Sequence, residues 1–397
     1  MATENNNKNL NVPNLRFPEF SGEWTKTTLG KIGETFNGLT GKSGSDFGQG
    51  SPYITYKSIF DNSKIDLSRV EYVTITDAER KKQTQNEVQY GDIFFTTSSE
   101  TPDEVGMTSV LLDEVKDCYL NSFCFGYRLN SITDVLPEYM RFYLRSNTIR
   151  RRLFVLAQGS TRFNISKGEV MGLTIKLPGT AEQRKIAQLL TMIEDRIATQ
   201  IKIIEDLKKL KSAISNHLFE SNDCERVKLS DIATVQMGQS PSSQSYNEEE
   251  RGLPLIQGNL DLQDGHLTPR VYASEITQQC EAGDVILTVR APVGEIAIAE
   301  FNACIGRGVC AIRPKRNADT MLIYQYLQYY KPKWASLEQG STFTSVSGAD
   351  IRSIHVNMPS PRTIKLLEEL EQKLSIEQNI LSVYIKQKLY FLAQMFI

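Results

Sequence analysis

The stretch QGSTRFNISKGEVMGLTIKLP, residues 158–178, occurs a second time as QGSTFTSVSGADIRSIHVNMP, residues 339–359. The two copies align without a gap, and six of their 21 positions are identical. Apolar positions match in kind, as in the pair Ile175 and Val356. An internal repeat of this size predicts two related structural units within one chain.

A long helical pattern follows each copy, with apolar residues at alternating steps of four and three. The two patterns match at an offset of 177 residues. Polar residues interrupt both patterns at the same places, because Gln200 corresponds to Glu377 and Lys211 corresponds to Lys388. Neither Gly nor Pro occurs from 180 to 220 or from 362 to the end. We therefore predict two long helices that pair with each other as an antiparallel coiled coil. The predicted pairing residues are Ile193, Ile197, Ile204, Leu370, Leu374 and Leu381.

The regions before the two motifs share a weaker pattern of short strands bounded by Gly, Asp and Asn. The stretch YGDIFFTTSS at 90–99 corresponds to AGDVILTVRA at 282–291. Helices are expected near 138–157 and 319–337. The predicted fold class is α+β, with two mixed α/β domains related by the repeat and separated by the two long helices. The predicted segments are a disordered lead-in at 1–13, a first domain at 14–179, a central helix at 180–220, a second domain at 221–360 and a C-terminal helix at 361–397.

Composition is typical of a globular protein, with 40% hydrophobic and 23% charged residues. No apolar run approaches the roughly 20 residues that span a bilayer, and the polar first ten residues are unlike a signal peptide. The six cysteines form no C-x-x-C pair and the three histidines lie apart from them, so we expect reduced thiols, a cytoplasmic location and no metal site. The net charge of −2 argues against a protein that coats nucleic acid by itself.

Six arginines and no acidic residue lie between Arg141 and Arg162. One interpretation is a patch that faces phosphates, and the other is a solvated helix face. Charge alone leaves both open.

Catalytic motifs are weak in this chain. The stretch GLTGKS at 38–43 lacks the first glycine of a phosphate loop, because position 36 is Phe36, so a flexible loop is the better interpretation. Asp103, followed by Glu114 and Lys116, fits the loose pattern of a Mg-dependent nuclease. A stand-alone nuclease using these residues is one alternative function, and a coiled-coil adaptor without a DNA role is another.

Two domains that each end in a G-S-T…Pro motif and a long repeated helix resemble the specificity subunit of Type I restriction–modification enzymes. The stretch NVPNLRFPEFSGEW at 11–24 also resembles the start of these subunits. The second helix departs from the first, because it opens RTIKLLEEL where the first has AEQRKI at 181–186. The resemblance covers essentially the whole chain.

The resemblance implies a non-catalytic subunit in a bacterial host-defence system of restriction and DNA methylation. Each domain would be a target recognition domain for one half of a bipartite, asymmetric site in double-stranded DNA, and the helices would fix the gap between the halves. The implied partners are two methyltransferase subunits and motor-nuclease subunits, with no membrane involved. S-adenosylmethionine, ATP and Mg²⁺ would be held by these partners, and this chain would bind no cofactor.

Polar residues in loops after apolar strands are the candidates for DNA contact, since amides and arginines can bind base edges in pairs of hydrogen bonds. Small hydroxyl residues beside a glycine suit phosphate contact. The candidates in the first domain are Lys57, Ser58, Thr97, Ser98, Ser99, Ser160, Thr161 and Arg162. The candidates in the second domain are Gln257, Asn259, Arg290, Arg307, Ser341 and Thr342. A surface turn or cap is the alternative role for each.

Overall fold

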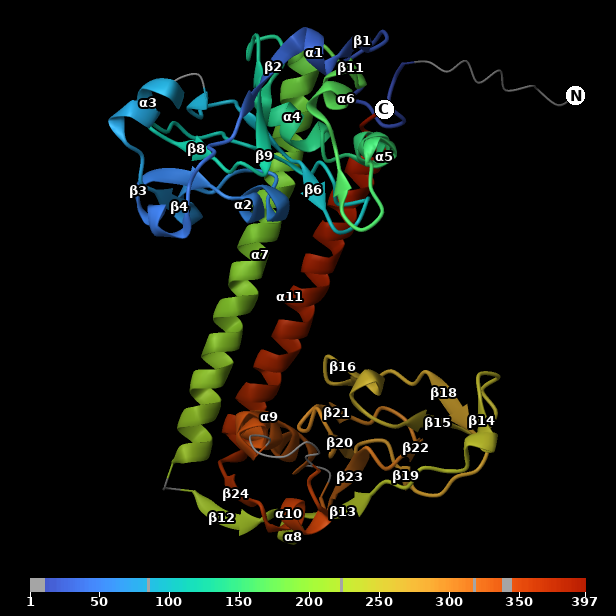
Figure 1. Cartoon of the computed structure of the whole chain (residues 1–397). Coiled ribbons are helices and arrows are strands. Elements are labelled where there is room, and N and C mark those ends of the chain that lie inside the picture. The colour runs from blue at the N-terminus through green and yellow to red at the C-terminus, as the bar shows by residue number, and fades with distance from the viewer. Residues whose placement is uncertain (1–10, 84–85, 222–223, 317–318, 338–344) are drawn as a thin grey trace, which may run out of the picture. The chain divides into compact units, whose positions relative to one another are not determined.

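The computed structural model of the chain describes residues 11–83, 86–221, 224–316, 319–337 and 345–397. The chain divides into two compact units, Met1–Thr199 with Leu381–Ile397 and Gln200–Ile380. Each unit is α+β and holds part of both long helices, α7 (Thr180–Glu220) and α11 (Pro361–Gln394) (Figure 1). The predicted α+β fold with long repeated helices is confirmed.

The first unit is built on a four-stranded antiparallel sheet with the order β2-β9-β5-β7. A second sheet has the order β4-β3-β8, in which β3 and β8 are parallel. The strands are β1 (Thr25–Thr28), β2 (Gly33–Asn37), β3 (Phe47–Ile54), β4 (Glu71–Val73), β5 (Ile93–Thr96), β6 (Ser98–Ser99), β7 (Thr108–Val110), β8 (Tyr119–Leu120), β9 (Cys124–Leu129), β10 (Phe163–Asn164) and β11 (Thr174–Leu177). The helices are α1 (Leu29–Ile32), α2 (Tyr56–Asp61), α3 (Asp77–Gln83), α4 (Pro137–Tyr143), α5 (Asn147–Leu156) and α6 (Lys167–Met171), with 3-10 turns η1 (Gly44–Asp46) and η2 (Leu67–Arg69).

The second unit repeats this plan, with a four-stranded sheet in the order β13-β23-β20-β21 and a second sheet in the order β14-β18-β15-β22-β19. Its strands are β12 (Glu225–Lys228), β13 (Ala233–Met237), β14 (Tyr246–Asn247), β15 (Leu253–Ile256), β16 (Leu262–Gln263), β17 (His266–Leu267), β18 (Val271–Ala273), β19 (Gln279–Cys280), β20 (Val285–Thr288), β21 (Ile296–Ile298), β22 (Ala303–Ile305), β23 (Val309–Pro314) and β24 (His355–Met358). Its helices are α8 (Leu229–Ile232), α9 (Thr320–Leu337) and α10 (Gly348–Ser353), with 3-10 turns η4 (Ser243–Ser245) and η5 (Asn259–Asp261).

The repeated Gly-Asp turn before β5 and β20 holds, in each unit, a buried aspartate that pairs with a partly exposed arginine. Asp92 is buried and accepts from the Nε of Arg128 on β9 at 2.7 Å. Asp284 accepts from the Nε of Arg313 on β23 at 3.0 Å in the same way. A buried carboxylate needs such a partner. The turn therefore ties together the two inner strands of each four-stranded sheet.

The repeated motif forms a cap and a strand rather than a simple turn into the long helix. Its shared serine is an N-cap, since Ser166 accepts from the N–H of Glu169 in α6 and Ser347 accepts from the N–H of Asp350 in α10. The segment then pairs as β11 with β1, or as β24 with β12, before Pro178 or Pro359 ends the strand. The shared capping serine and the shared proline thus serve local structure.

The helix expected near 138–157 is two helices, α4 and α5. Ser146 lies between them in an extended conformation, and its hydroxyl accepts from the N–H of Ile149. A serine at this place stops one helix and starts the next. The helix expected near 319–337 is the single helix α9.

Within each unit, α7 and α11 pack antiparallel. In the second unit the two seam interruptions meet, because the amide of Gln200 donates to the carbonyl oxygen and the carboxylate of Glu377 at 3.0 and 2.6 Å. Lys211 pairs with Glu371 in that unit, and Lys388 pairs with Glu194 in the first unit at 2.7 Å. The two ion pairs are equivalent under the repeat, because Lys388 lies 177 residues after Lys211 and Glu371 lies 177 residues after Glu194. Of the predicted pairing residues, Ile193, Ile204 and Leu374 are buried, whereas Ile197, Leu370 and Leu381 are half-buried.

A phenylalanine near the end of each long helix enters a tyrosine cluster. Phe219 at the end of α7 packs edge-on against Tyr326 of α9, with ring centroids 5.1 Å apart. Phe396, just after α11, packs against Tyr139 and Tyr143 of α4 at 5.7 Å. Both phenylalanines are buried, so each unit's core is completed by the end of a long helix.

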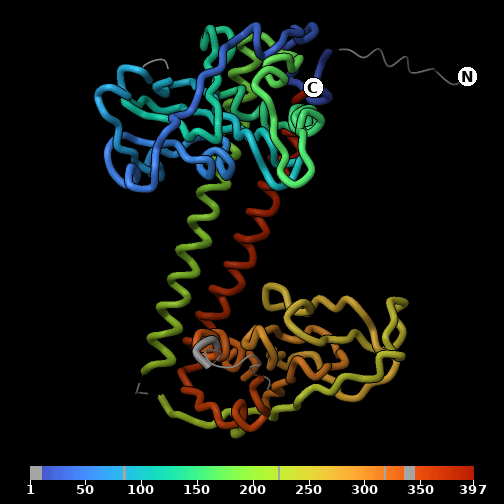
Figure 2. The backbone as a smooth tube through the Cα atoms, viewed as in Figure 1, coloured from blue at the N-terminus to red at the C-terminus, as the bar shows by residue number. Residues whose placement is uncertain are grey.

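The segment AEQRKI at the start of α7 is part of the first unit's interior. Glu182 is buried and binds the guanidinium of Arg16, whose Nη2 lies 2.7 Å away. Gln183 is also buried and accepts from the N–H of Leu136 at 2.9 Å. The N–H of Leu15 donates to the carbonyl of Gln394, so the stretch around Leu15 lies beside the C-terminal end of α11 (Figure 2). Glu182 in this segment therefore anchors residues 11–24 to the first unit through Arg16.

Candidate nucleic-acid interface

Four candidate residues of the second unit line one hollow of about 490 Å³. They come from three loops that are distant in sequence, one after β15, one after β20 and one before β23. The candidates in the hollow are Gln257, Asn259, Arg290 and Arg307, and the lining also includes Ser240, Pro241, Ser243, Tyr246, Gly258, Ala291 and Gly308.

The carboxylate of Asp261 stabilises the turn that carries Gln257 and Asn259. This carboxylate is buried and accepts from the N–H groups of Gln257 and Gly258, at 2.8 and 3.3 Å. Its other oxygen accepts from the Nε of Arg270 at 2.8 Å. The two amide side chains therefore sit on a fixed turn. Sequence inspection missed Asp261, although it closes the stretch LIQGNLD.

The two arginines supply positive charge to the hollow. Arg290 and Arg307 are exposed, and neither makes an ion pair with any described carboxylate. The backbone N–H of Arg307 donates to the hydroxyl of Ser240 at 3.2 Å, and Arg290 forms an isolated bridge with Ser345. An amide pair beside two unpaired guanidiniums is suited to base edges and phosphates.

Candidates of the first unit also gather, around β6. The strand β10, which follows the loop at 158–162, pairs with β6 so that Asn164 faces Ser98. The hydroxyl of Tyr56 donates to the carbonyl of Ser98 at 2.6 Å. This contact brings the exposed Lys57 and the half-buried Ser58 of α2 to the same region. The motif is thus part of the candidate surface of this unit.

Three of these candidates have a hydroxyl that is either already donating or buried. Thr97 donates to the carbonyl of Phe123 at 2.7 Å, and Ser99 donates to the carboxylate of Glu104 at 3.1 Å. The hydroxyl of Ser98 is buried. Because phosphate oxygens only accept hydrogen bonds, the structure weighs against these three side chains as phosphate contacts.

The loop at 158–162 presents the remaining candidates of the first unit. Gln158 and Asn164 exchange backbone hydrogen bonds. Gly159 has a φ of +135, and a Cβ there would lie 2.1 Å from the carbonyl oxygen of Arg162, so this position requires glycine. Ser160, Thr161 and Arg162 are exposed at the tip. Their counterparts Ser341 and Thr342 lie outside the described residues.

Four of the six arginines between 141 and 162 brace the fold. Arg145 donates to the carbonyls of Thr108, Ile59, Phe60 and Asn62, and burial lowers its pKa to about 10. Arg150 donates to the carbonyls of Gly106, Asp103 and Val105. Arg141 pairs with Glu194, and Arg152 donates to Thr174. Neither open interpretation of this cluster holds for Arg141, Arg145 and Arg150. Arg152 keeps one side of its guanidinium toward a hollow described below, and Arg151 and Arg162 are exposed.

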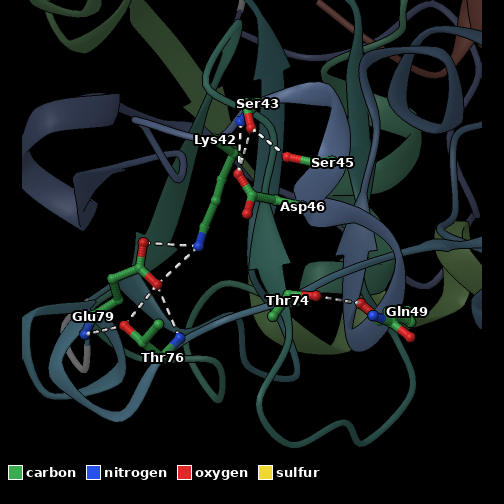
Figure 3. Close-up of polar contacts among 8 residues, drawn as sticks. All are labelled: Lys42, Ser43, Ser45, Asp46, Gln49, Thr74, Thr76 and Glu79. Carbon is green, nitrogen blue, oxygen red and sulfur yellow. Dashed lines mark hydrogen bonds and ion pairs between the residues drawn. The ribbon is translucent and has the colours of Figure 1, made fainter.

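Two catalytic interpretations find no support. Asp103, Glu114 and Lys116 lie outside helices and strands, and in the described part of the chain no three His, Cys, Asp or Glu residues are arranged to hold a metal. Lys42 of GLTGKS is bound to the carboxylate of Glu79 at 2.7 and 2.8 Å, and that carboxylate also accepts from Thr76 (Figure 3). The lysine anchors its loop to α3. Among the described helices, none is both long and apolar enough to cross a membrane.

Comparison with known proteins shows one family. A family model described as Type I restriction modification DNA specificity domain matches residues 21–209 and 221–383. A protein of Methanocaldococcus jannaschii provisionally named the type I restriction enzyme MjaX specificity subunit is 29% identical over 375 residues, covering 89% of this chain and 87% of its own. The MjaIX specificity subunit of the same organism is 27% identical over 149 residues, which is 34% of each chain.

Solved structures show the same fold. The S subunit of a Type I restriction–modification system from M. genitalium matches with a TM-score of 0.65 at 18% identity, covering 97% of this chain and 99% of its own. A chain from a study of complex assembly and conformational transition of the type I R-M system matches with a TM-score of 0.58 at 22% identity, covering 93% and 96%.

Proposed function

Because the chain belongs to the family of Type I restriction modification DNA specificity domains, we propose that it reads a bipartite, asymmetric site in double-stranded DNA, one half with each unit. The observation that carries this proposal is the hollow of the second unit, where Gln257 and Asn259 lie beside Arg290 and Arg307. The family contributes specificity and no catalysis.

Each side chain in the hollow has a defined chemical role in this proposal. An arginine binds guanine through O6 and N7, and an amide binds adenine through N6 and N7. The hydroxyls and Arg162 of the 158–162 loop, together with Lys57, would hold phosphates in the first unit. Asp261 keeps the amide turn rigid, so that the geometry of both amides is set before DNA binds.

The paired helices act in this proposal as a spacer between the two half-sites, and they dock two methyltransferase subunits. Motor-nuclease subunits complete the enzyme, and the partners carry S-adenosylmethionine, ATP and Mg²⁺. The proposed location is the cytoplasm, where the thiols stay reduced. Support comes from the antiparallel helix contacts within each unit and from the likeness to the chain solved in the study of type I R-M complex assembly.

The test is to produce the chain with the methyltransferase subunits of its own system and to map methylated adenines in DNA. The wild-type chain should give one split sequence. Arg290→Ala or Asn259→Ala should relax one half by about 10- to 100-fold in preference, since a bidentate contact contributes about 1–3 kcal/mol, while the other half stays intact.

Arg251→Ala is the matched control, because Arg251 is an exposed arginine of the same unit that pairs with Glu249 and does not line the hollow. It should leave both halves unchanged. Equal loss of preference in both halves with Arg290→Ala, or none in either, would contradict the assignment of the hollow.

A further inference from the structure

Two lysines face each other across the ribbon β1–β11 of the first unit. The register pairs Lys26 with Lys176, and residues directly opposite in an antiparallel pair point to the same face. Like charges at such positions destabilise the pair. Lys26 is exposed and Lys176 half-buried, so the two ammonium groups share one patch of surface. An anion bound between them would remove the repulsion.

A third cation completes this patch. Lys26, Lys176 and Arg152 line a hollow of about 440 Å³, together with Glu169, Leu156, Gly172, Leu173 and Thr174. Figure 1 shows β1, β11, α5 and α6 gathered at this place. No carboxylate among the described residues forms an ion pair with any of the three cations.

The one acid that lines this hollow is already bound elsewhere. The Oε1 of Glu169 accepts from the amide of Gln158 at 2.8 Å, and its Oε2 accepts from the hydroxyl of Ser166 at 2.7 Å. With three cations and one carboxylate the hollow carries a net charge of about +2. Volumes of roughly 300–1,000 Å³ are usual for ligand sites, so a phosphate group fits easily.

The second repeat offers an internal comparison. There the same ribbon position pairs Arg226 with Asn357, and the amide of Asn357 donates to the carbonyls of Phe219 and Ser221 at 2.9 and 3.1 Å. An amide that is satisfied by the chain itself replaces the second lysine. The cationic pair is therefore specific to the first unit and is not required by the ribbon.

We propose that the hollow formed by Lys26, Lys176 and Arg152 binds DNA backbone phosphates outside the bases that the first unit reads. This inference rests on the proposed DNA-binding function. The link between hollow and reading surface is direct, because Glu169 of the hollow binds Gln158, the first residue of the exposed loop that ends at Arg162. Phosphate contacts of this kind add affinity and salt dependence without sequence preference.

The experiment measures binding of the full chain, with its methyltransferase partners, to duplexes that contain the mapped site or a scrambled one, at several salt concentrations. Lys176→Asn installs the residue of the other repeat, and Lys26→Glu places an acid opposite Lys176. Each lost phosphate contact should make the slope of log Kobs against log salt less negative by about 0.9. The loss of affinity between 50 and 200 mM salt should then be about 3.5-fold smaller.

Lys26→Glu also separates binding from folding. It replaces a repulsive pair with an attractive one, so its melting temperature should equal or exceed the wild-type value while its DNA affinity falls on both duplexes. Lys176→Arg should retain binding. Lys31→Glu is the charge-matched control for Lys26→Glu, because Lys31 is exposed on α1 of the same unit and does not line the hollow.

Wild-type salt slopes and affinities in Lys26→Glu and Lys176→Asn, with the preference of the wild-type chain for its site preserved, would overturn the inference. Unchanged DNA affinity together with loss of assembly with the methyltransferase would also overturn it, in favour of an acidic protein partner. A wild-type chain without any sequence preference would instead contradict the proposed function itself.

Discussion

At the scale of single residues, the role of a charge is set by the partner it meets. Lys42 lies in a Gly/Ser/Lys loop, yet its side chain is buried against Glu79, which also receives the N–H and hydroxyl of Thr76. The hydrogen bond from Lys42, with those from Thr76, lowers the pKa of Glu79 to about 2. The lysine is a structural anchor, and the loop from Gly38 is positioned by it.

This anchor predicts a defined acid sensitivity. A lowered carboxyl pKa gives stability that is complete above the unfolded value of about 4.5 and is lost as pH falls toward about 2. Lys42→Met should flatten the dependence of the unfolding midpoint on pH between about 4.5 and 2, measured by urea titration. Lys82→Met, on the exposed face of α3, should keep the wild-type dependence, and an unaltered profile in Lys42→Met would contradict the anchor.

At the scale of elements, the polar breaks in the helix seams specify which residues meet. Gln200 and Glu377 interrupt their seams at equivalent positions and hydrogen-bond to each other. Lys211 and Lys388, the second pair of breaks, each find a glutamate on the other helix within their own unit. Polar residues in an apolar seam fix register at some cost in stability.

The Gln200–Glu377 contact can be tested by a double-mutant cycle. Gln200→Leu should lower the free energy of unfolding by about 1–3 kcal/mol, because the half-buried carboxylate of Glu377 loses its donor. Adding Glu377→Leu should restore stability by making the seam continuous. Denaturant unfolding of the four proteins measures the coupling, and strictly additive losses would exclude an interaction between the two side chains.

At the scale of the whole molecule, the proposed spacer makes the length of α7 and α11 a determinant of the DNA site. The two helices contain 41 and 34 residues, and in each unit the segments that pair run in opposite directions. Any change of length must therefore be made in both helices to keep the contacts in register. One turn of four residues keeps the phase of the seam.

A four-residue insertion after Thr199 together with one after Ile380 adds about 6 Å of helix. The gap between methylated half-sites should widen by about one to two base pairs, at roughly 3.4 Å each, and the half-site sequences should stay the same. Mapping methylated adenines gives the readout. Four residues inserted after Glu249, in an exposed turn, should leave the gap unchanged, and a gap that ignores the helix insertions would rule out the spacer.

The sequence by itself determined the repeat, the α+β units and the long paired helices, because periodicity and capping are local properties of the chain. The sequence shows that Gln200 and Glu377 interrupt their seams at equivalent positions, and the structure shows that the two side chains are in contact. The predicted DNA contacts stay predictions, although the fold brings Gln257, Asn259, Arg290 and Arg307 into one hollow.

Only the tertiary structure decided which charges face outward. Arg145 and Arg150 look like Arg162 in sequence, but carbonyl groups more than 35 residues away bind their guanidiniums. Likewise, only the structure shows that Lys42 pairs with Glu79 and that Lys26 lies opposite Lys176. Composition and spacing do not state the partner of a charge, because that partner is supplied by chain packing between segments that are distant in sequence.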